Sequence, residues 1–214
     1  MTRPPAARLR RVAVPAFLFI ASAVFIALAL EARGTPYFPI DLTITRALQT
    51  IDHPAFAALM RGVSWFGFPP QVVVLGATSI VLLALLGLRR EALGLAFAGI
   101  SGWVVTWIQL LIGRPRPSPD LVHVLSHLTT PSFPSGHVMA YTSYFGFLAY
   151  VARARLRPSW IRTAVLVLLG LLIVLVGPSR IYLGHHWFSD VVGAYALGTL
   201  WLALSIRLYR WWRL

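Results

Sequence analysis

The chain has 214 residues, of which 58% are hydrophobic and only 12% are charged, and its formal net charge is +13. Soluble domains carry about a quarter charged residues, so this composition excludes an ordinary soluble domain and places much of the apolar surface in lipid. All 19 basic residues are arginine, and most lie in short clusters between apolar runs. This pattern is typical of membrane-protein loops and excludes nucleic acid as a partner. The absence of cysteine excludes disulfides and thiolate metal ligands.

Six apolar segments approach the length of about 20 residues that a membrane-spanning helix needs. In chain order they are Val12–Leu30, Pro69–Leu88, Ala92–Ile112, Val138–Val151, Thr163–Val176 and Trp187–Ile206. The fourth and fifth are short, and we expect each to extend at one end. The sequence therefore predicts an all-α integral membrane protein, with residues 1–214 forming one domain of six transmembrane helices in a bundle.

The arginines between these segments predict the orientation. Thirteen lie on one side: Arg3, Arg8, Arg10, Arg11, Arg89, Arg90, Arg153, Arg155, Arg157, Arg162, Arg207, Arg210 and Arg213. Six lie on the other: Arg33, Arg46, Arg61, Arg114, Arg116 and Arg180. Because arginine-rich loops stay in the cytoplasm, we expect both termini to be cytoplasmic in a multi-pass protein of the cell (inner or plasma) membrane.

The first segment and the stretch after it each allow a second interpretation. Arg8–Arg11, the apolar run and Ala27–Ala29 resemble a cleavable signal peptide, although an apolar run of this length favours a retained helix. Residues 31–67 form the longest extracytoplasmic stretch and are rich in proline and glycine. We expect this stretch to contain short helices that lie at the membrane surface.

Polar residues that suit phosphate chemistry gather in three segments on the predicted extracytoplasmic side: Gln109–Pro117, Pro131–His137 and Ser179–Asp190. Arg116 and Arg180 can hold phosphate oxygens in a bidentate manner. Ser135 and Gly136 precede a predicted helix, where free backbone N–H groups favour an anion and glycine permits close approach. In an antiparallel bundle the three segments can converge at one end.

Two histidines and an aspartate in these segments suit nucleophilic catalysis. His186 and Asp190 are four residues apart at the predicted start of the last helix, a spacing that places them on one face. Asp190 can accept the Nδ1 proton of His186 and leave Nε2 free to attack. His137 titrates near neutral pH and can act first as an acid and then as a base.

These residues resemble the signature of the type 2 phosphatidic-acid phosphatase superfamily, which includes the vanadium haloperoxidases. The superfamily pattern is Lys, six residues and Arg-Pro; then Pro-Ser-Gly-His; then Ser-Arg, five residues, His, three residues and Asp. The matching positions here are Arg116-Pro117, Pro134–His137, Ser179-Arg180, His186 and Asp190. The first position departs from the pattern, because Gln109 stands where the superfamily has lysine.

The resemblance implies a phosphatase that hydrolyses a lipid phosphate or diphosphate without a metal or another cofactor. It implies that His186 forms a phosphohistidine, that Arg116, Arg180, Ser135 and Gly136 hold the phosphate, and that His137 transfers protons. By resemblance, the substrates are polyprenyl diphosphate, phosphatidic acid or phosphatidylglycerol phosphate, and membrane lipids are the expected partners. The few acidic residues form no paired-carboxylate motif for a metal ion.

Two alternatives to a phosphatase stay open, and Gln109 argues for the second of them. Glutamine brings no charge, so the phosphate site lacks one cation, and Arg114 is the nearest residue that could compensate. One alternative is a lipid phosphotransferase that uses the same phosphohistidine. The other is a non-catalytic lipid-binding membrane protein with a degenerate site. A vanadate-dependent peroxidase is disfavoured, because such enzymes are, by resemblance, larger and soluble.

Overall fold

The computed structural model describes residues 5–212, with side chains from Val12 onward, and these residues form helices joined by turns and loops. Arg3 and Arg213, which the orientation argument uses, lie outside the described residues. The helices are α1 (Pro5–Ala32), α2 (Pro39–Gln49), α3 (Pro54–Trp65), α4 (Gln71–Leu85), α5 (Arg89–Gly99), α6 (Ser101–Ile112), α7 (Gly136–Ala140), a π-helical turn (Tyr141–Phe145), α8 (Gly146–Arg155), α9 (Trp160–Tyr182) and α10 (Phe188–Trp211).

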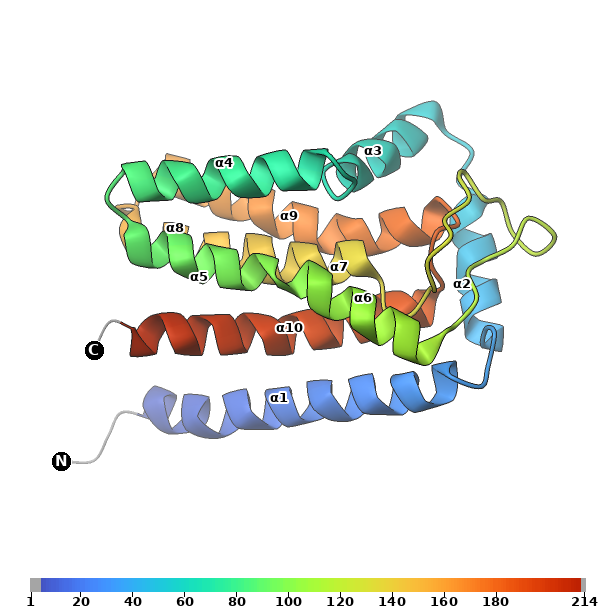
Figure 1. The fold of residues 1–214 in the computed structure, drawn as a ribbon, viewed down its shortest axis with the longest axis horizontal. Coiled ribbons are helices and arrows are strands. Elements are labelled where there is room, and N and C mark those ends of the chain that lie inside the picture. Colours follow the sequence, from blue (N-terminus) through green and yellow to red (C-terminus); the bar gives the residue numbers. More distant parts are fainter. Residues whose placement is uncertain (1–4, 213–214) are drawn as a thin grey trace.

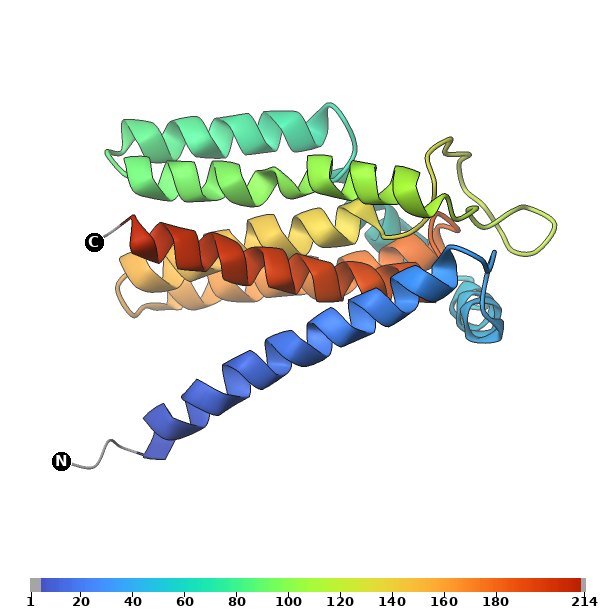
Figure 2. The same ribbon diagram turned by 60° about the horizontal axis from the view of Figure 1, so that its bottom comes forward.

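The long helices lie side by side in a bundle, in which α10 lies between α1 and α5 (Figure 1). α10 contacts α1, α5, α7 and the π-helical turn, while α3 and α8 pack on α9. α1 contacts α10 near the end of α1 and leans away from the bundle toward its own start (Figure 2). The first predicted segment is therefore a helix that packs against the rest of the protein.

Four helical segments of residues 5–212 are long and apolar enough to cross a membrane: Val12–Ala32, Arg89–Ile112, Trp160–Tyr182 and Phe188–Trp211. The prediction of an all-helical membrane protein is confirmed. The two other predicted spans are helical but less regular. The second shortens to α4, which has 15 residues. The fourth is a continuous helix through α7, the π-helical turn and α8.

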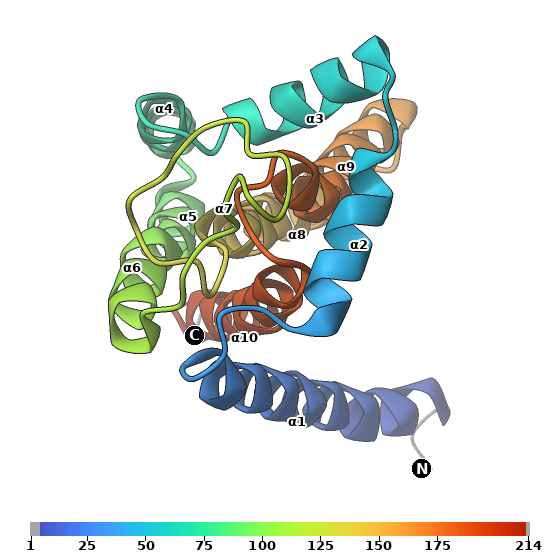
Figure 3. The ribbon, with the colours of Figure 1, turned by 90° about the vertical axis from the view of Figure 1, so that its right-hand side faces the viewer.

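The two ends of the bundle differ in their connections (Figure 1). One end carries the α4–α5 turn, the α8–α9 turn, the start of α1 and the end of α10, which are the arginine-rich connections. The other end carries α2, α3 and the long loop between α6 and α7. Residues 31–67 thus contain two short helices, α2 and α3, which lie across this end (Figure 3).

Local features of α9 position Ser179 and Arg180 at this end of the bundle. Ser159 caps its start by accepting a hydrogen bond from the Arg162 backbone N–H at 3.2 Å. Pro178, inside the helix, lacks the N–H that would bond the Val174 carbonyl. The Tyr195 hydroxyl on α10 lies 2.7 Å from the Ile173 carbonyl and 3.1 Å from the Val174 carbonyl, so it contacts α9 where this bond is missing. α9 continues past Pro178 to Tyr182 and so includes Ser179 and Arg180.

Candidate active site

The three polar segments meet at the end of the bundle that α2 and α3 cross. Gln109 lies in the last turn of α6, and Arg116 lies on the α6–α7 loop. Ser135, Gly136 and His137 open α7, Arg180 lies in the last turn of α9 and Asp190 lies in the first turn of α10. His186 lies in the α9–α10 turn, one residue before the Trp187 N-cap, so the prediction that it shares a helix face with Asp190 is wrong.

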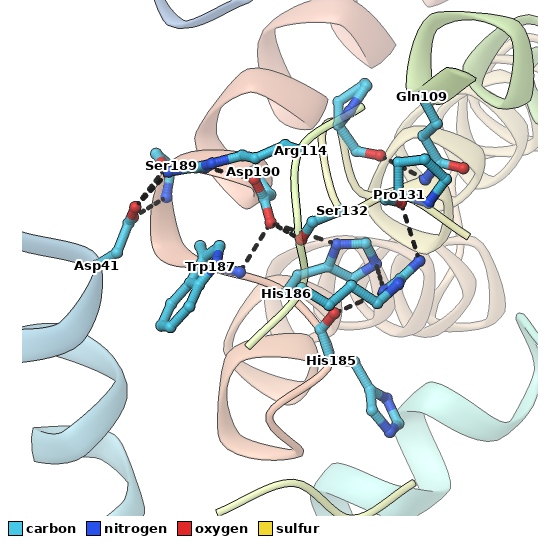
Figure 4. Close-up of polar contacts among 12 residues, drawn as sticks. Asp41, Gln109, Arg114, Pro131, Ser132, His185, His186, Trp187, Ser189 and Asp190 are labelled. Carbon is cyan, nitrogen blue, oxygen red and sulfur yellow. Dashed lines mark hydrogen bonds and ion pairs between the residues drawn. The ribbon is translucent and has the colours of Figure 1, made fainter. Parts of the chain in front are cut away.

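His186 nevertheless faces both groups that its predicted role requires. Its Nε2 lies 3.1 Å from the Arg116 Nη1. Its Nδ1 lies 3.6 Å from the Asp190 Oδ2, and Figure 4 shows these two side chains next to each other. The second distance is slightly longer than a hydrogen bond, as catalytic contacts often are before substrate binds. Burial, together with the charges of Arg116 and Arg180, lowers the pKa of His186 well below 6.5. The imidazole is therefore neutral at neutral pH, the form that a nucleophile needs.

Arg116 is held by oxygen atoms of the chain around it. Its Nε donates to the Thr130 carbonyl at 2.6 Å, its Nη2 to the Thr130 hydroxyl at 2.9 Å, and its Nη1 to the His185 carbonyl at 2.6 Å. Desolvation lowers its pKa to about 10, although the Asp190 carboxylate opposes the shift. The guanidinium stays charged at neutral pH and has a fixed direction beside His186.

Arg180 is a buried cation with an unused donor. Its Nη1 donates to the Ser64 hydroxyl, and its guanidinium lies over the Phe68 ring at 5.0 Å from the centroid. Its Nε has no hydrogen-bond partner. A buried guanidinium without a carboxylate is costly, so this position favours an anionic ligand.

His137 is enclosed by aromatic rings. The Phe68 ring meets it edge-on at a centroid distance of 4.5 Å, and the Tyr141 ring stacks at 6.4 Å. Gly67 packs directly on the imidazole, because a Cβ at position 67 would come within 2.3 Å of the His137 Cδ2. The α3–α4 connection therefore fixes the ring, and its Nε2 is buried without a partner.

Buried polar atoms without partners gather at this site. Among the described residues there are six such side-chain atoms: Thr45 Oγ1, Ser135 Oγ, His137 Nε2, Arg180 Nε, His185 Nδ1 and His186 Nδ1. Four of them belong to residues that the sequence singled out. Buried polar groups are nearly always paired, so their grouping here marks a place where a polar ligand binds. By contrast, Gly136 is not forced by crowding, since a Cβ there would meet only Val105 at 3.5 Å.

Gln109 and Arg114 have roles that the sequence did not reveal. Gln109 is buried and donates from Nε2 to the Pro134 carbonyl at 2.9 Å, which joins α6 to the segment before α7. Arg114 turns to two buried carboxylates, Asp41 at 2.8 Å and Asp190 at 2.6 Å. These contacts use its guanidinium, so the structure gives no support to Arg114 as a compensating phosphate ligand.

Several residues of the site carried no local signal in the sequence. Asp41 and Ser189 hold Arg114, Ser132 donates from its hydroxyl to the Asp190 Oδ2, and Ser64 accepts from Arg180. Asp41 and Arg114 are 73 residues apart. The two carboxylates of Asp41 and Asp190 do approach one arginine together, a pairing that no spacing motif predicts.

His185, beside the predicted nucleophile, is buried rather than lipid-facing. Its Nε2 lies 2.8 Å from the Ser126 hydroxyl of the α6–α7 loop. Burial, together with Arg180, His186 and Arg116, lowers its pKa to about 3. The preceding residue, Gly184, has a left-handed φ of +66°, and a Cβ there would collide with the His123 carbonyl at 2.1 Å. The α9–α10 turn therefore packs tightly against the α6–α7 loop.

Comparison with known proteins agrees with this geometry. The sequence pattern of the PAP2 superfamily matches residues 91–214. Phosphatidylglycerophosphatase B of Bacillus subtilis is 30% identical over 199 residues, which cover 87% of this chain and 89% of that protein.

The chain belongs to the PAP2 superfamily. It is a PAP2 membrane phosphatase that acts on lipid phosphates, which confirms the resemblance seen in the three motifs. Decaprenylphosphoryl-5-phosphoribose phosphatase of Mycobacterium tuberculosis is 33% identical over 168 residues, covering 74% of this chain and 84% of that protein. The crystal structure of a transmembrane PAP2-type phosphatidylglycerolphosphate phosphatase from Bacillus subtilis superposes with a TM-score of 0.74 at 28% identity, covering 89% of this chain and 94% of that one.

Proposed function

We propose that this PAP2 phosphatase hydrolyses a lipid phosphate monoester through a phosphohistidine on His186, with phosphatidylglycerol phosphate as the first candidate substrate. The observation that carries the proposal is the group of buried, unpartnered atoms on Ser135, His137, Arg180 and His186. Phosphatidylglycerophosphatase B and the phosphatidylglycerolphosphate phosphatase of known structure, which align with 87% and 89% of this chain, support this lipid as the first candidate.

The reaction requires two phosphate transfers. The Nε2 of His186 attacks phosphorus in line, so a P–N bond forms while the ester P–O bond breaks. In the first transfer His137 is protonated and donates its proton to the departing alkoxide; in the second, the neutral ring takes a proton from the water that hydrolyses the phosphohistidine. Asp190 accepts a hydrogen bond from the Nδ1–H of His186, and its carboxylate balances the charge that the ring gains.

Charge on the transferred group is balanced by the half-buried Arg116 and the buried Arg180. Arg116 and Arg180 face the equatorial oxygens, and the Ser135 hydroxyl and the Gly136 N–H complete the cradle. Two cations match the two negative charges of a phosphate monoester, and this match supports a monoester over a diphosphate. The expected chemistry uses no metal and no cofactor.

An apolar cavity beside the site supports a lipid substrate. It has a volume of about 680 Å³ and lies between α4, α6 and the π-helical turn. Tyr141, whose ring stacks on His137, forms part of its wall, as do Phe66 and Leu75. A hydrocarbon tail in this cavity would place a phosphate headgroup near His137 and His186.

The arginine distribution supports a six-span topology with both termini in the cytoplasm and the site on the extracytoplasmic face. Contact of α1 with α10, and of the Phe25 ring with Phe133 at 6.0 Å, supports retention of the first helix. In this arrangement α2 and α3 lie at the outer membrane surface, and residues 1–214 act as one domain.

The test is phosphate release by the protein purified in detergent, with EDTA present, from phosphatidylglycerol phosphate, phosphatidic acid and a polyprenyl diphosphate. We expect turnover of the monoesters and a phosphoenzyme after acid quenching, both of which are lost in His186→Ala. Full activity of His186→Ala would refute the phosphohistidine. Transfer to an added lipid alcohol without free phosphate would instead identify a phosphotransferase, and absence of any turnover would identify a non-catalytic protein.

A further inference from the structure

Asp41 lies in the first turn of α2, and its side chain is fully buried against the start of α10. Its Oδ1 accepts from the Ser189 backbone N–H at 2.7 Å. Its Oδ2 accepts from the Phe38 N–H at 2.9 Å, the Ser189 hydroxyl at 2.9 Å and the Arg114 Nη2 at 2.8 Å. None of these contacts belongs to the phosphate cradle, so Asp41 has no assigned role in the reaction.

Arg114 links this carboxylate to the one beside the nucleophile (Figure 4). Its Nη1 contacts the Asp190 Oδ1 at 2.6 Å and the Ser189 hydroxyl at 2.7 Å, and its Nε donates to the Thr35 carbonyl at 3.2 Å. All three charged side chains are fully buried. One guanidinium therefore serves two carboxylates, and the three groups together carry a net negative charge.

This arrangement determines which oxygen of Asp190 is available to His186. Arg114 occupies Oδ1, so Oδ2 is directed toward the Trp187 N–H at 2.8 Å, the Ser132 hydroxyl and the Nδ1 of His186 at 3.6 Å. Removal of the Asp41 charge would leave Arg114 to pair with Asp190 alone. Asp190 would then be a weaker acceptor for the positive charge that the His186 ring gains on attack.

We infer that Asp41 is a positioning residue for phosphate transfer, acting through Arg114 on the Asp190–His186 pair. The inference rests on the proposed phosphohistidine mechanism. Asp41 holds Arg114 at a shared position, and this keeps part of the negative charge of Asp190 available to His186. It also ties α2, at the membrane surface, to the first turn of α10, which follows the turn that carries His186.

The test compares Asp41→Asn with Asp52→Asn, which changes an exposed carboxylate in the α2–α3 loop. We expect Asp41→Asn to lower kcat, and the rate of phosphoenzyme formation in acid-quenched samples, by about 10- to 100-fold. The KM for the lipid and the inhibition constant of inorganic phosphate should stay within about 2-fold, because the phosphate cradle is untouched. Asp52→Asn should match the wild type.

A second variant separates charge from packing. Ser189→Ala removes a hydroxyl that contacts both Asp41 and Arg114 but keeps every charge and both ion pairs of Arg114. Its kcat should therefore fall by no more than about 3-fold, less than in Asp41→Asn. An equal loss in Ser189→Ala and Asp41→Asn would overturn the inference, as would a fall in kcat with a matching loss of phosphate affinity. If Asp41→Asn does not fold, Asp41→Glu, which keeps the charge but shifts it, should show the same separation of kcat from KM.

Different results would refute the phosphohistidine mechanism and the role of Asp41. An inactive wild type, or an active His186→Ala, would remove the phosphohistidine mechanism itself. An active wild type and an inactive His186→Ala, with Asp41→Asn equal to Asp52→Asn, would remove only the role of Asp41.

Discussion

The guanidinium of Arg116 lies against the proposed nucleophile, with its Nη1 3.1 Å from the Nε2 of His186. Both groups come from loops, and Arg116 also donates to the carbonyl of His185, the residue before His186. A phosphate group that bridges the two would replace this contact with a charge-assisted hydrogen bond and a P–N bond. The geometry therefore holds the proposed nucleophile and a candidate phosphate-binding cation side by side.

Replacement of Arg116 by lysine should lower kcat by about 100-fold, although the charge is kept. Lysine cannot reproduce the forked contacts with the Thr130 carbonyl, the Thr130 hydroxyl and the His185 carbonyl, so the cation would lose its direction. Steady-state hydrolysis of a lipid monoester measures the effect. Arg61→Lys, a change at an exposed arginine of α3, serves as the control and should leave kcat unchanged. Wild-type kcat in Arg116→Lys would show that only the charge matters.

The buried histidines predict a loss of stability in acid. The pKa of His185 falls to about 3 and that of His186 lies well below 6.5, so both stay neutral in the folded protein. As the pH falls below 6.5 the unfolded chain takes up protons that the folded protein does not, so folding stability decreases. Each such histidine contributes a slope of about 1.4 kcal/mol per pH unit between pH 6.5 and its folded pKa.

His185→Gln tests the contribution of His185 to this pH dependence. Glutamine can keep the hydrogen bond to the Ser126 hydroxyl but does not titrate. Thermal unfolding in detergent should be measured between pH 4 and pH 7. As the pH falls, the stability of the variant should decrease less steeply than that of the wild type, with a slope smaller by the equivalent of about one bound proton. Identical pH dependence in variant and wild type would mean that His185 is protonated in the folded protein.

Gly67→Ala should impair catalysis without contacting the phosphate. The added Cβ would lie 2.3 Å from the Cδ2 of His137, so the imidazole must move. We expect kcat to fall by about 10- to 100-fold. Gly62→Ala is a matched control, because a Cβ there meets nothing within 4 Å, and it should leave kcat unchanged. Equal activity of the two variants would show that the position of His137 is not critical.

Gln109→Lys tests the departure from the superfamily pattern. A lysine can keep a hydrogen bond to the Pro134 carbonyl and adds a cation near the phosphate cradle. A charged donor exceeds a neutral one by about 1 kcal/mol, so the KM for a lipid monoester should fall by about 5-fold. Gln109→Leu, which removes the hydrogen bond without adding charge, is the control and should raise KM. An unchanged KM in Gln109→Lys would mean that residue 109 does not act on the substrate.

The sequence identified most of the phosphate-contacting residues proposed here because their motifs are local. Ser135 and His137 are two residues apart, and His186 and Asp190 are four apart, so chain connectivity alone keeps each pair close. The prediction of a shared helix face for His186 and Asp190 was wrong, because α10 begins only at Phe188. Their approach depends instead on the cap that Asp190 makes with the Trp187 N–H.

The amino-acid order by itself determined the membrane class, the approximate helices and the chemistry of the three motifs, because hydropathy and motif spacing depend only on near neighbours. Tertiary structure alone decided the rest. It turned Arg114 away from the phosphate cradle and toward Asp41, 73 residues earlier, and it placed Gly67 against His137. Such contacts depend on how the helices pack. A buried charge is stabilised by an opposite charge that lies close to it in space, even when the two residues are far apart along the chain.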